Sequence, residues 1–96
     1  MAPRWIKTKD KPGSFPTRHP EDDWLMLSGG FVVGRVFPAE AGSGPPRWIW
    51  SLTGPYTPQE SGARTHGDAP GRNEAMAALL ANWRRWQDWA GMRDAE

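Results

Sequence analysis

The side chains that could carry out acid–base or metal chemistry are few, and they are scattered along the chain. His19 and His66 are the only side chains that titrate near neutral pH, and the sequence has no cysteine. Neither histidine has a carboxylate or a second histidine at the spacing of a metal site. We therefore interpret both histidines as surface residues.

Two short motifs share features with binding loops but lack the rest of the pattern. The run Glu21-Asp22-Asp23 could bind a cation, yet consecutive acids before a strand are typical of a solvated turn. Ser28 and Ser43 each precede glycine, without the spacing of a phosphate-binding loop or a nearby helix start. The sequence thus predicts no catalytic residue, no metal site and no cofactor, and we expect the protein not to be an enzyme.

Positive charge gathers at the N-terminus, although the formal net charge of the chain is only +1. Residues 1–19 carry five cations against one acid, residues 20–60 carry two arginines against five acids, and residues 61–96 are balanced. An overall basic balance, which would favour nucleic acid or an anionic membrane, is absent. Nucleic-acid binding therefore depends on a basic arm made of Arg4, Lys7, Lys9 and Lys11.

Two kinds of apolar segment are missing from the sequence. No apolar run approaches the roughly 18–20 residues of a membrane span, and no apolar segment follows the N-terminal charges as it would in a signal peptide. We therefore expect no membrane contact. The cytoplasm is the expected location, because the chain also lacks cysteine.

Tryptophan is the main resource for building a core. Ninety-six residues suffice for one domain, and without cysteine no disulfide can stabilise it. The chain has seven tryptophans, and each removes roughly 150–250 Å² from water when buried. Either most of them form the core, or some of them form an exposed aromatic surface.

Three apolar runs separated by turn residues predict strands at 24–27, 31–37 and 47–52. Gly29-Gly30 predicts a tight hairpin between the first two, because glycine accepts the positive φ of such turns. Pro38 ends the second strand, and Thr53-Gly54-Pro55 ends the third. This order predicts a three-stranded antiparallel meander.

A C-terminal amphipathic helix is predicted over 73–89. Asn73 is its expected cap and Gly91 its expected terminator. At about 100° per residue one apolar stripe emerges, and it can pack on the indole-rich face of the sheet. Its residues are Met76, Leu79, Leu80, Trp83, Trp86 and Ala90. The fold class is therefore α+β, with the helix packed on one face of the meander.

The chain outside these elements divides into three stretches. Residues 1–20 are an arm that is either flexible or docked on the sheet through Trp5 and Phe15. Residues 53–72 form a long connection that could hold one short edge strand at 63–66. Residues 92–96 are expected to fray, so that 21–91 is the single domain.

Alternation along the strands separates a core face from an outer face. The core face holds Val32, Val36, Trp48, Trp50 and Leu52, and Gly34 leaves room there for an indole of the neighbouring strand. The outer face is too apolar for a solvated surface, so we expect it to be covered. It is the predicted interaction surface, together with Trp89 on the flank of the helix. The residues of this surface are Phe31, Val33, Arg35, Phe37, Arg47, Ile49 and Trp89.

The order of these features resembles a group of small bacterial proteins, common in rhizobia and their relatives, that have no assigned function. The matching residues are Trp24, Gly34, Arg35, Val36, Trp48, Trp50, Ser51, Leu52, Gly67, Ala69, Glu74, Ala75, Ala77, Ala78 and Trp83. The resemblance covers roughly residues 24–90 and implies no activity. More loosely, strands followed by a helix opening with Glu-Ala resemble the arm-binding domains of phage-type integrases, which read DNA with the outer sheet face. The chain lacks that family's density of basic residues on the sheet.

Two functions are compatible with this pattern. The first is a small non-catalytic interaction module that binds a protein partner or itself through the outer sheet face and the helix end. The alternative is a nucleic-acid-binding module that uses Arg35, Arg47 and the basic arm.

Overall fold

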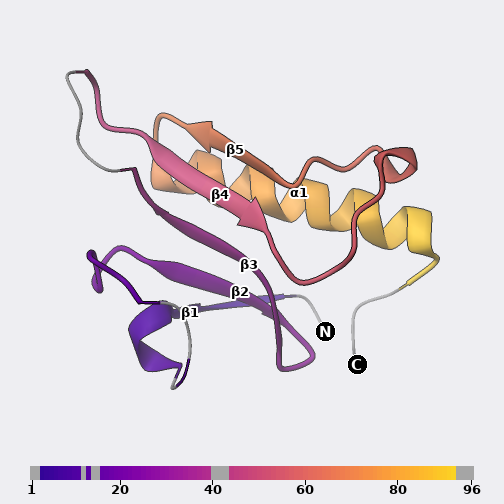
Figure 1. The fold of residues 1–96 in the computed structure, drawn as a ribbon, viewed down its shortest axis with the longest axis horizontal. Helices are drawn as coiled ribbons and strands as arrows, with labels where there is room; N and C mark the ends of the chain where they lie inside the picture. The colour runs from indigo at the N-terminus through magenta and orange to yellow at the C-terminus, as the bar shows by residue number, and fades with distance from the viewer. Residues whose placement is uncertain (1–2, 12, 14–15, 40–43, 93–96) are drawn as a thin grey trace.

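Five strands form one antiparallel sheet in the computed structural model, and a single long helix lies on one of its faces (Figure 1). The structure describes residues 3–11, 13, 16–39 and 44–92. The strands are β1 (Arg4–Lys7), β2 (Trp24–Ser28), β3 (Phe31–Pro38), β4 (Trp48–Leu52) and β5 (His66–Ala69), and the helix is α1 (Arg72–Ala90). Each strand pairs with the next along the chain, so the sheet order is β1-β2-β3-β4-β5.

The prediction of three strands was wrong, because the sheet gains one strand at each edge. β1 comes from the predicted arm, and β5 comes from the 53–72 connection, starting where the suggested edge strand at 63–66 ends. Both strands are four residues long, and their sequences RWIK and HGDA lack a clear apolar alternation. Pairing with an existing strand supplies the backbone hydrogen bonds that these segments could not gain alone. The α+β class and the antiparallel pairing are confirmed.

The β2–β3 hairpin has the turn that its glycines predict, but it also contains a bulge. Gly29 and Gly30 adopt φ values of 58° and 85°, as a two-residue hairpin turn of the primed type requires. The register shifts between Met26 and Leu27, so Val33 has no partner in β2. This extra residue interrupts the alternation, and Val33 lies in the core at 5% exposure.

Helix α1 extends one residue beyond the predicted range 73–89 at each end, and Gly91 terminates it as predicted. Gly71, rather than Asn73, is the N-cap, and the Glu74 carboxylate lies where a side chain at position 71 would be. Gly91 adopts the left-handed conformation at the C-terminal end, and the Met92 N–H donates to the Gln87 carbonyl at 2.9 Å. This pair of features closes the helix as in a Schellman motif.

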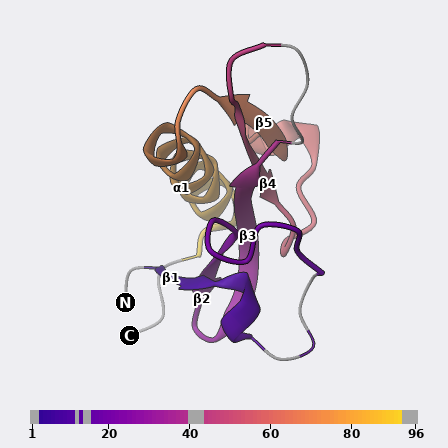
Figure 2. The ribbon, with the colours of Figure 1, turned by 90° about the vertical axis from the view of Figure 1, so that its left-hand side faces the viewer.

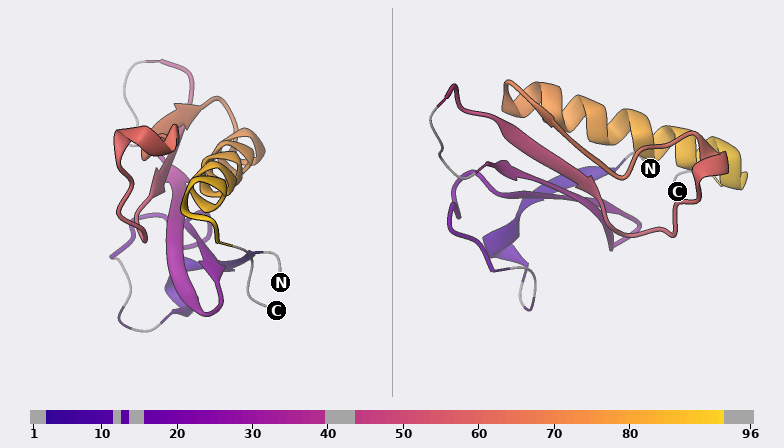
Figure 3. Two further views of the ribbon diagram at one scale, coloured as in Figure 1. Left: turned by 90° about the vertical axis from the view of Figure 1, so that its right-hand side faces the viewer. Right: turned by 45° about the horizontal axis from the view of Figure 1, so that its top comes forward.

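The core lies between α1 and strands β3 to β5, as the views from the two ends show (Figure 2, Figure 3). Trp50, Leu79 and Trp83 are buried as predicted, whereas Trp48 is half-buried at its margin. The predicted stripe of the helix is shifted, because Gln87 is buried and Ala90 is exposed.

Two glycines make room for large side chains, although the prediction placed the indole over the wrong one. A Cβ at Gly34 would lie 2.6 Å from Leu79 Cδ2, so the space there belongs to the helix and not to an indole. The indole of Trp50 instead lies over Gly67 of β5, where a Cβ would be 2.7 Å from Nε1. The close approach of the helix to β3 therefore depends on Gly34, and the position of the Trp50 indole over β5 depends on Gly67.

Candidate interaction surfaces

The predicted outer sheet face is closed by a buried ion pair. The Arg35 guanidinium contacts the Asp23 carboxylate twice, with Nη2 to Oδ2 at 2.5 Å and Nε to Oδ1 at 2.9 Å. Arg35 Nη2 also donates to the Pro16 carbonyl at 3.2 Å, and its Cζ lies 4.5 Å from the centroid of the Phe37 ring. Together with the burial of Val33, these contacts remove the centre of the predicted surface from solvent.

Asp23 is the residue that ties the N-terminal segment to the sheet. Its side chain is 1% exposed and accepts a hydrogen bond from Thr8 Oγ1 at 2.6 Å, and its carbonyl accepts one from the Thr8 N–H. Burial by itself raises the pKa of Asp23, but the hydrogen bonds from Arg35, Thr8 and Thr17 outweigh it and hold the pKa below its usual value. Sequence reasoning placed Asp23 in a solvated turn, because nothing local indicates that Arg35 lies against it.

A second, exposed ion pair lies beside the remaining outer-face residues. Arg47 Nε lies 2.9 Å from Asp68 Oδ2, and the hydrogen bond from Arg47 lowers the pKa of Asp68. Phe37 and Ile49 are half-buried and face each other in the β3–β4 register. The outer face, which was predicted to be apolar and covered, is thus bordered by these two ion pairs.

The basic arm is also partly neutralised. Lys7 Nζ and Lys9 Nζ share the two oxygens of Glu21, at 2.8 and 2.6 Å. The hydrogen bonds from these two ammonium groups lower the pKa of Glu21 to about 2. Arg4 is exposed at the edge of the sheet, and Lys11 is half-buried.

The large exposed apolar side chains of the described residues come from three segments near one end of the molecule. Phe31 is 77% exposed, Tyr56 84%, Trp89 48% and Met92 51%. Phe31 opens β3 after the β2–β3 turn, Tyr56 follows β4, and Trp89 and Met92 close α1. These three segments lie toward the same end of the molecule (Figure 1, Figure 3). We call these four residues the aromatic end.

A rigid scaffold holds the aromatic end in place. Trp86 Nε1 donates a hydrogen bond of 2.9 Å to the Tyr56 carbonyl, which attaches the loop after β4 to the helix. Trp86 also stacks on buried Trp83, with ring centroids 5.2 Å apart and planes 11° apart. The exposed rings are thus carried by segments whose backbone is fixed from beneath. Only Phe31 and Trp89 belonged to the predicted surface, and Tyr56 was missed because a lone tyrosine in a Pro-rich segment gives no periodic signal.

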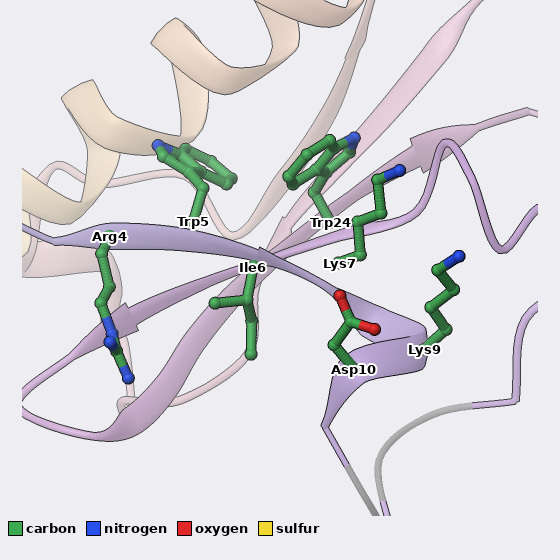
Figure 4. A pocket seen from close by; sticks show the side chains of 7 residues that line it. All are labelled: Arg4, Trp5, Ile6, Lys7, Lys9, Asp10 and Trp24. Carbon is green, nitrogen blue, oxygen red and sulfur yellow. The ribbon is translucent and has the colours of Figure 1, made fainter.

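A second exposed aromatic site lies at the other edge of the sheet, on the face that carries the helix. The side chains of Trp5 and Trp24 rise from β1 and β2 toward the helix side, beside Lys7 (Figure 4). They line an open depression of ≈ 680 Å³ whose other residues are Arg4, Ile6, Lys9 and Asp10. The sequence showed the cations and the tryptophans separately, but their juxtaposition depends on the unpredicted strand β1.

Further comparisons add no identity to these surfaces. Within the described residues no three His, Cys, Asp or Glu side chains are grouped as a metal site requires. In that same part of the chain no helix has the length and apolar character to cross a membrane. Comparison with protein-family models, with curated proteins and with solved structures finds no match. The function is therefore argued from the surfaces alone.

Proposed function

We propose that the protein is a small non-catalytic interaction module that binds another protein, or a second copy of itself, through the aromatic end. The observation that carries the proposal is the exposure of Phe31, Tyr56, Trp89 and Met92, whose segments lie toward one end of the molecule (Figure 1), while the other large apolar side chains of the described residues are buried wholly or in part. Exposed apolar side chains that cluster mark binding surfaces, whereas scattered ones do not.

The area and the residue types suit an interface core. The three exposed rings leave roughly 400 Å² of aromatic surface in water, which is about half of the roughly 800 Å² that each partner buries in a standard interface. Tyrosine and tryptophan are enriched among the residues that dominate binding energy. A rim of neighbouring polar residues would supply the remaining area.

The charges beside Trp89 suit a two-fold contact between identical chains. Arg85 and Asp88 are exposed and lie on the same side of α1 as Trp89, at spacings of three and four residues from Arg85. In an isologous contact each patch meets its own copy, so Arg85 of one chain can face Asp88 of the other. A patch with one cation and one acid is complementary to itself.

The nucleic-acid alternative that uses Arg35 and Arg47 receives less support. Arg35 is engaged with Asp23 and Arg47 with Asp68, so each would have to leave a carboxylate before it could bind a phosphate. For Arg35 the partner is buried, and its uncompensated charge would be costly.

Sedimentation equilibrium of the full chain between about 1 and 300 µM tests the self-association version. The mass is expected to rise above the monomer value of 10.7 kDa as the concentration increases. The double variant Phe31→Ser, Trp89→Ser is expected to remain at the monomer mass, whereas Arg47→Ser on the outer face serves as the control and should associate normally.

A constant mass of 10.7 kDa for the unmodified chain would contradict self-association. Binding of a different protein at the aromatic end would then be tested by direct measurement with a purified partner. Equal affinity of that partner for the unmodified chain and for the Phe31→Ser, Trp89→Ser variant would contradict the aromatic end as the binding surface.

A further inference from the structure

The depression beside Trp5 and Trp24 is independent of the aromatic end and has a different chemical character. In the β1–β2 register Trp5 lies opposite Met26, and Lys7 lies opposite Trp24. Residues of one strand separated by two positions share a face, so these four side chains occupy one square of the sheet. The two tryptophans are at the diagonal corners of that square.

This part of the sheet remains open because the helix lies elsewhere. Helix α1 packs mainly on β3, β4 and β5, and the flank that carries Asn82 and Trp86 is bound to the connection before β5. Met26 is fully buried, whereas Trp5 and Trp24 are only partly buried at the margin of the core. The two indoles therefore stand at the edge of the packed region with part of their surfaces accessible.

Two neighbouring indoles on one face are suited to hold a planar ring by stacking. Diagonal neighbours on one face of an antiparallel pair are roughly 7–8 Å apart. A flat ring that stacks on both sides needs about twice a stacking distance of roughly 3.5 Å, which is the usual contact distance between carbon atoms. Figure 4 shows the two indoles with a gap between them and with the Lys7 side chain close to Trp24.

Lys7 and Lys9 lie beside Trp24, whereas the Arg4 side chain extends to the opposite side of β1 (Figure 4). Three cations and one carboxylate line the depression, namely Arg4, Lys7, Lys9 and Asp10. Lys7 Nζ lies 5.6 Å from the centroid of the Trp24 ring, and Arg72 Cζ lies 5.8 Å from it. Arg72 also lines a smaller depression of ≈ 300 Å³ together with Asp22 and Glu74. Because these two acids repel an anion, an anion is favoured beside Lys7 and Lys9 instead.

From these observations we propose that the site between Trp5 and Trp24 binds a nucleotide unit, either free or within a single strand of nucleic acid. The base stacks on the two indoles, and the phosphate binds at Lys7 and Lys9. Stacking on aromatic side chains combined with cations that follow the phosphates is the general mode of single-strand recognition. The combination of indoles and cations indicates this ligand class, because a purely apolar ligand would not need the cations.

The ion pairs with Glu21 do not prevent phosphate binding. The Glu21 side chain is 66% exposed and that of Lys9 is 40% exposed, so their contact lies in water. Exposed ion pairs contribute little to stability, and a phosphate can replace the carboxylate as the partner of both lysines. Displacement of Glu21 also predicts that affinity falls as the salt concentration rises.

Isothermal titration of the full chain with adenosine monophosphate and with a ten-nucleotide oligo-dA strand tests the proposal. Saturable binding is expected for at least one of them, and Trp5→Leu should weaken it by roughly 5- to 100-fold, the range of one lost base–indole stack. Trp89→Leu, at the aromatic end, is the matched control and should leave the affinity unchanged. Equal affinity for both ligands identifies a free nucleotide as the ligand, and tighter binding of the strand identifies single-stranded nucleic acid.

Three results would overturn the proposal: no binding of either ligand at millimolar concentration, unchanged affinity in Trp5→Leu, or equally tight binding of inorganic phosphate. If Trp5→Leu does not fold, the unmodified chain decides by two-dimensional NMR. The indole N–H signals of Trp5 and Trp24 should then shift on addition of the ligand, while that of Trp89 should stay in place. A shift of Trp89 alone would move the site to the aromatic end and exclude this one.

Discussion

The two faces of the sheet are closed by different kinds of interaction. On the helix side, apolar side chains of α1 meet Trp50 and Val36, and the contact is made close by Gly34 and Gly67. On the outer side, the segment after β1 is fixed by a polar cluster in which Asp23 binds Arg35 and Thr8. The helix side therefore rests on packed apolar side chains, whereas the outer side combines buried Leu25, opposite Arg35, with a buried carboxylate held by that arginine.

Because of this difference, the two faces should tolerate different substitutions. A packed apolar contact is insensitive to pH but sensitive to added volume. A buried carboxylate held by an arginine accepts changes in volume at its margin but is sensitive to the loss of either charge. Four measurements can test this contrast.

Adding volume at Gly34 should damage the helix side most. A Cβ there would lie 2.6 Å from Leu79 Cδ2 and 2.8 Å from the backbone oxygen of Ser51, which cannot rotate away. We expect Gly34→Val to lower the free energy of unfolding by about 3 kcal/mol or more, at the upper end of overpacking effects. Urea unfolding followed by tryptophan fluorescence measures the change.

Gly44→Val is the matched control for that experiment, because a Cβ at Gly44 meets no atom within 4 Å. Its effect should be small. A Gly34→Val protein as stable as the Gly44→Val protein would show that the helix can move away from the sheet at little cost, and the contrast between the faces would fail.

Removing the charge of Asp23 should weaken the contact between the N-terminal segment and the outer side of the sheet. Asp23→Asn leaves the partly buried Arg35 guanidinium without its counter-ion, and we expect a loss of about 2–3 kcal/mol at pH 7. The neighbouring Asp22→Asn is the control, because Asp22 is exposed. A loss no larger than that of Asp22→Asn would mean that packing alone closes this face.

The same pair of proteins predicts a dependence on pH. The pKa of Asp23 is lower in the folded chain than in the unfolded chain, where it is about 3.9. The stabilisation is therefore complete above about pH 5 and is lost as the pH falls through the folded-state pKa. The difference in stability between the unmodified protein and Asp23→Asn should shrink as the pH is lowered from 5 toward 2. A difference that stays constant over that range would contradict the ion pair as its source.

The sequence predicted the parts of the fold that local patterns control. The Gly29-Gly30 turn, the strands around Val36 and Trp50, and the amphipathic helix all follow from local propensity and periodicity. The two edge strands did not, because their formation depends on pairing with β2 and β4 rather than on their own residues. The bulge at Val33 was also hidden, since one extra residue in β3 becomes apparent only from the β2 register.

The site residues also divide into those that local patterns indicate and those that depend on long-range pairing. Phe31 and Trp89 could be selected from the sequence because they belong to or flank a periodic pattern, and both are exposed. Arg35 was placed on the correct face, but its partner Asp23 is twelve residues away and in a segment that appeared to be a turn. Trp5 and Trp24 could not be brought together without β1. Long-range pairing, and not residue type, limited the prediction.

The exposed pair between Arg47 and Asp68 provides the smallest test of the contrast. Their side chains are 44% and 53% exposed, so the charges stay solvated and their attraction is screened. We expect Arg47→Gln to change the free energy of unfolding by less than about 1 kcal/mol, and the change should vanish in 1 M salt. A loss as large as that of Asp23→Asn would show that the outer face is held along its whole width by ion pairs. A small, salt-sensitive loss would show that the ion pair at Asp23 stabilises the outer face and the one at Asp68 does not, because only the ion pair at Asp23 is withdrawn from water.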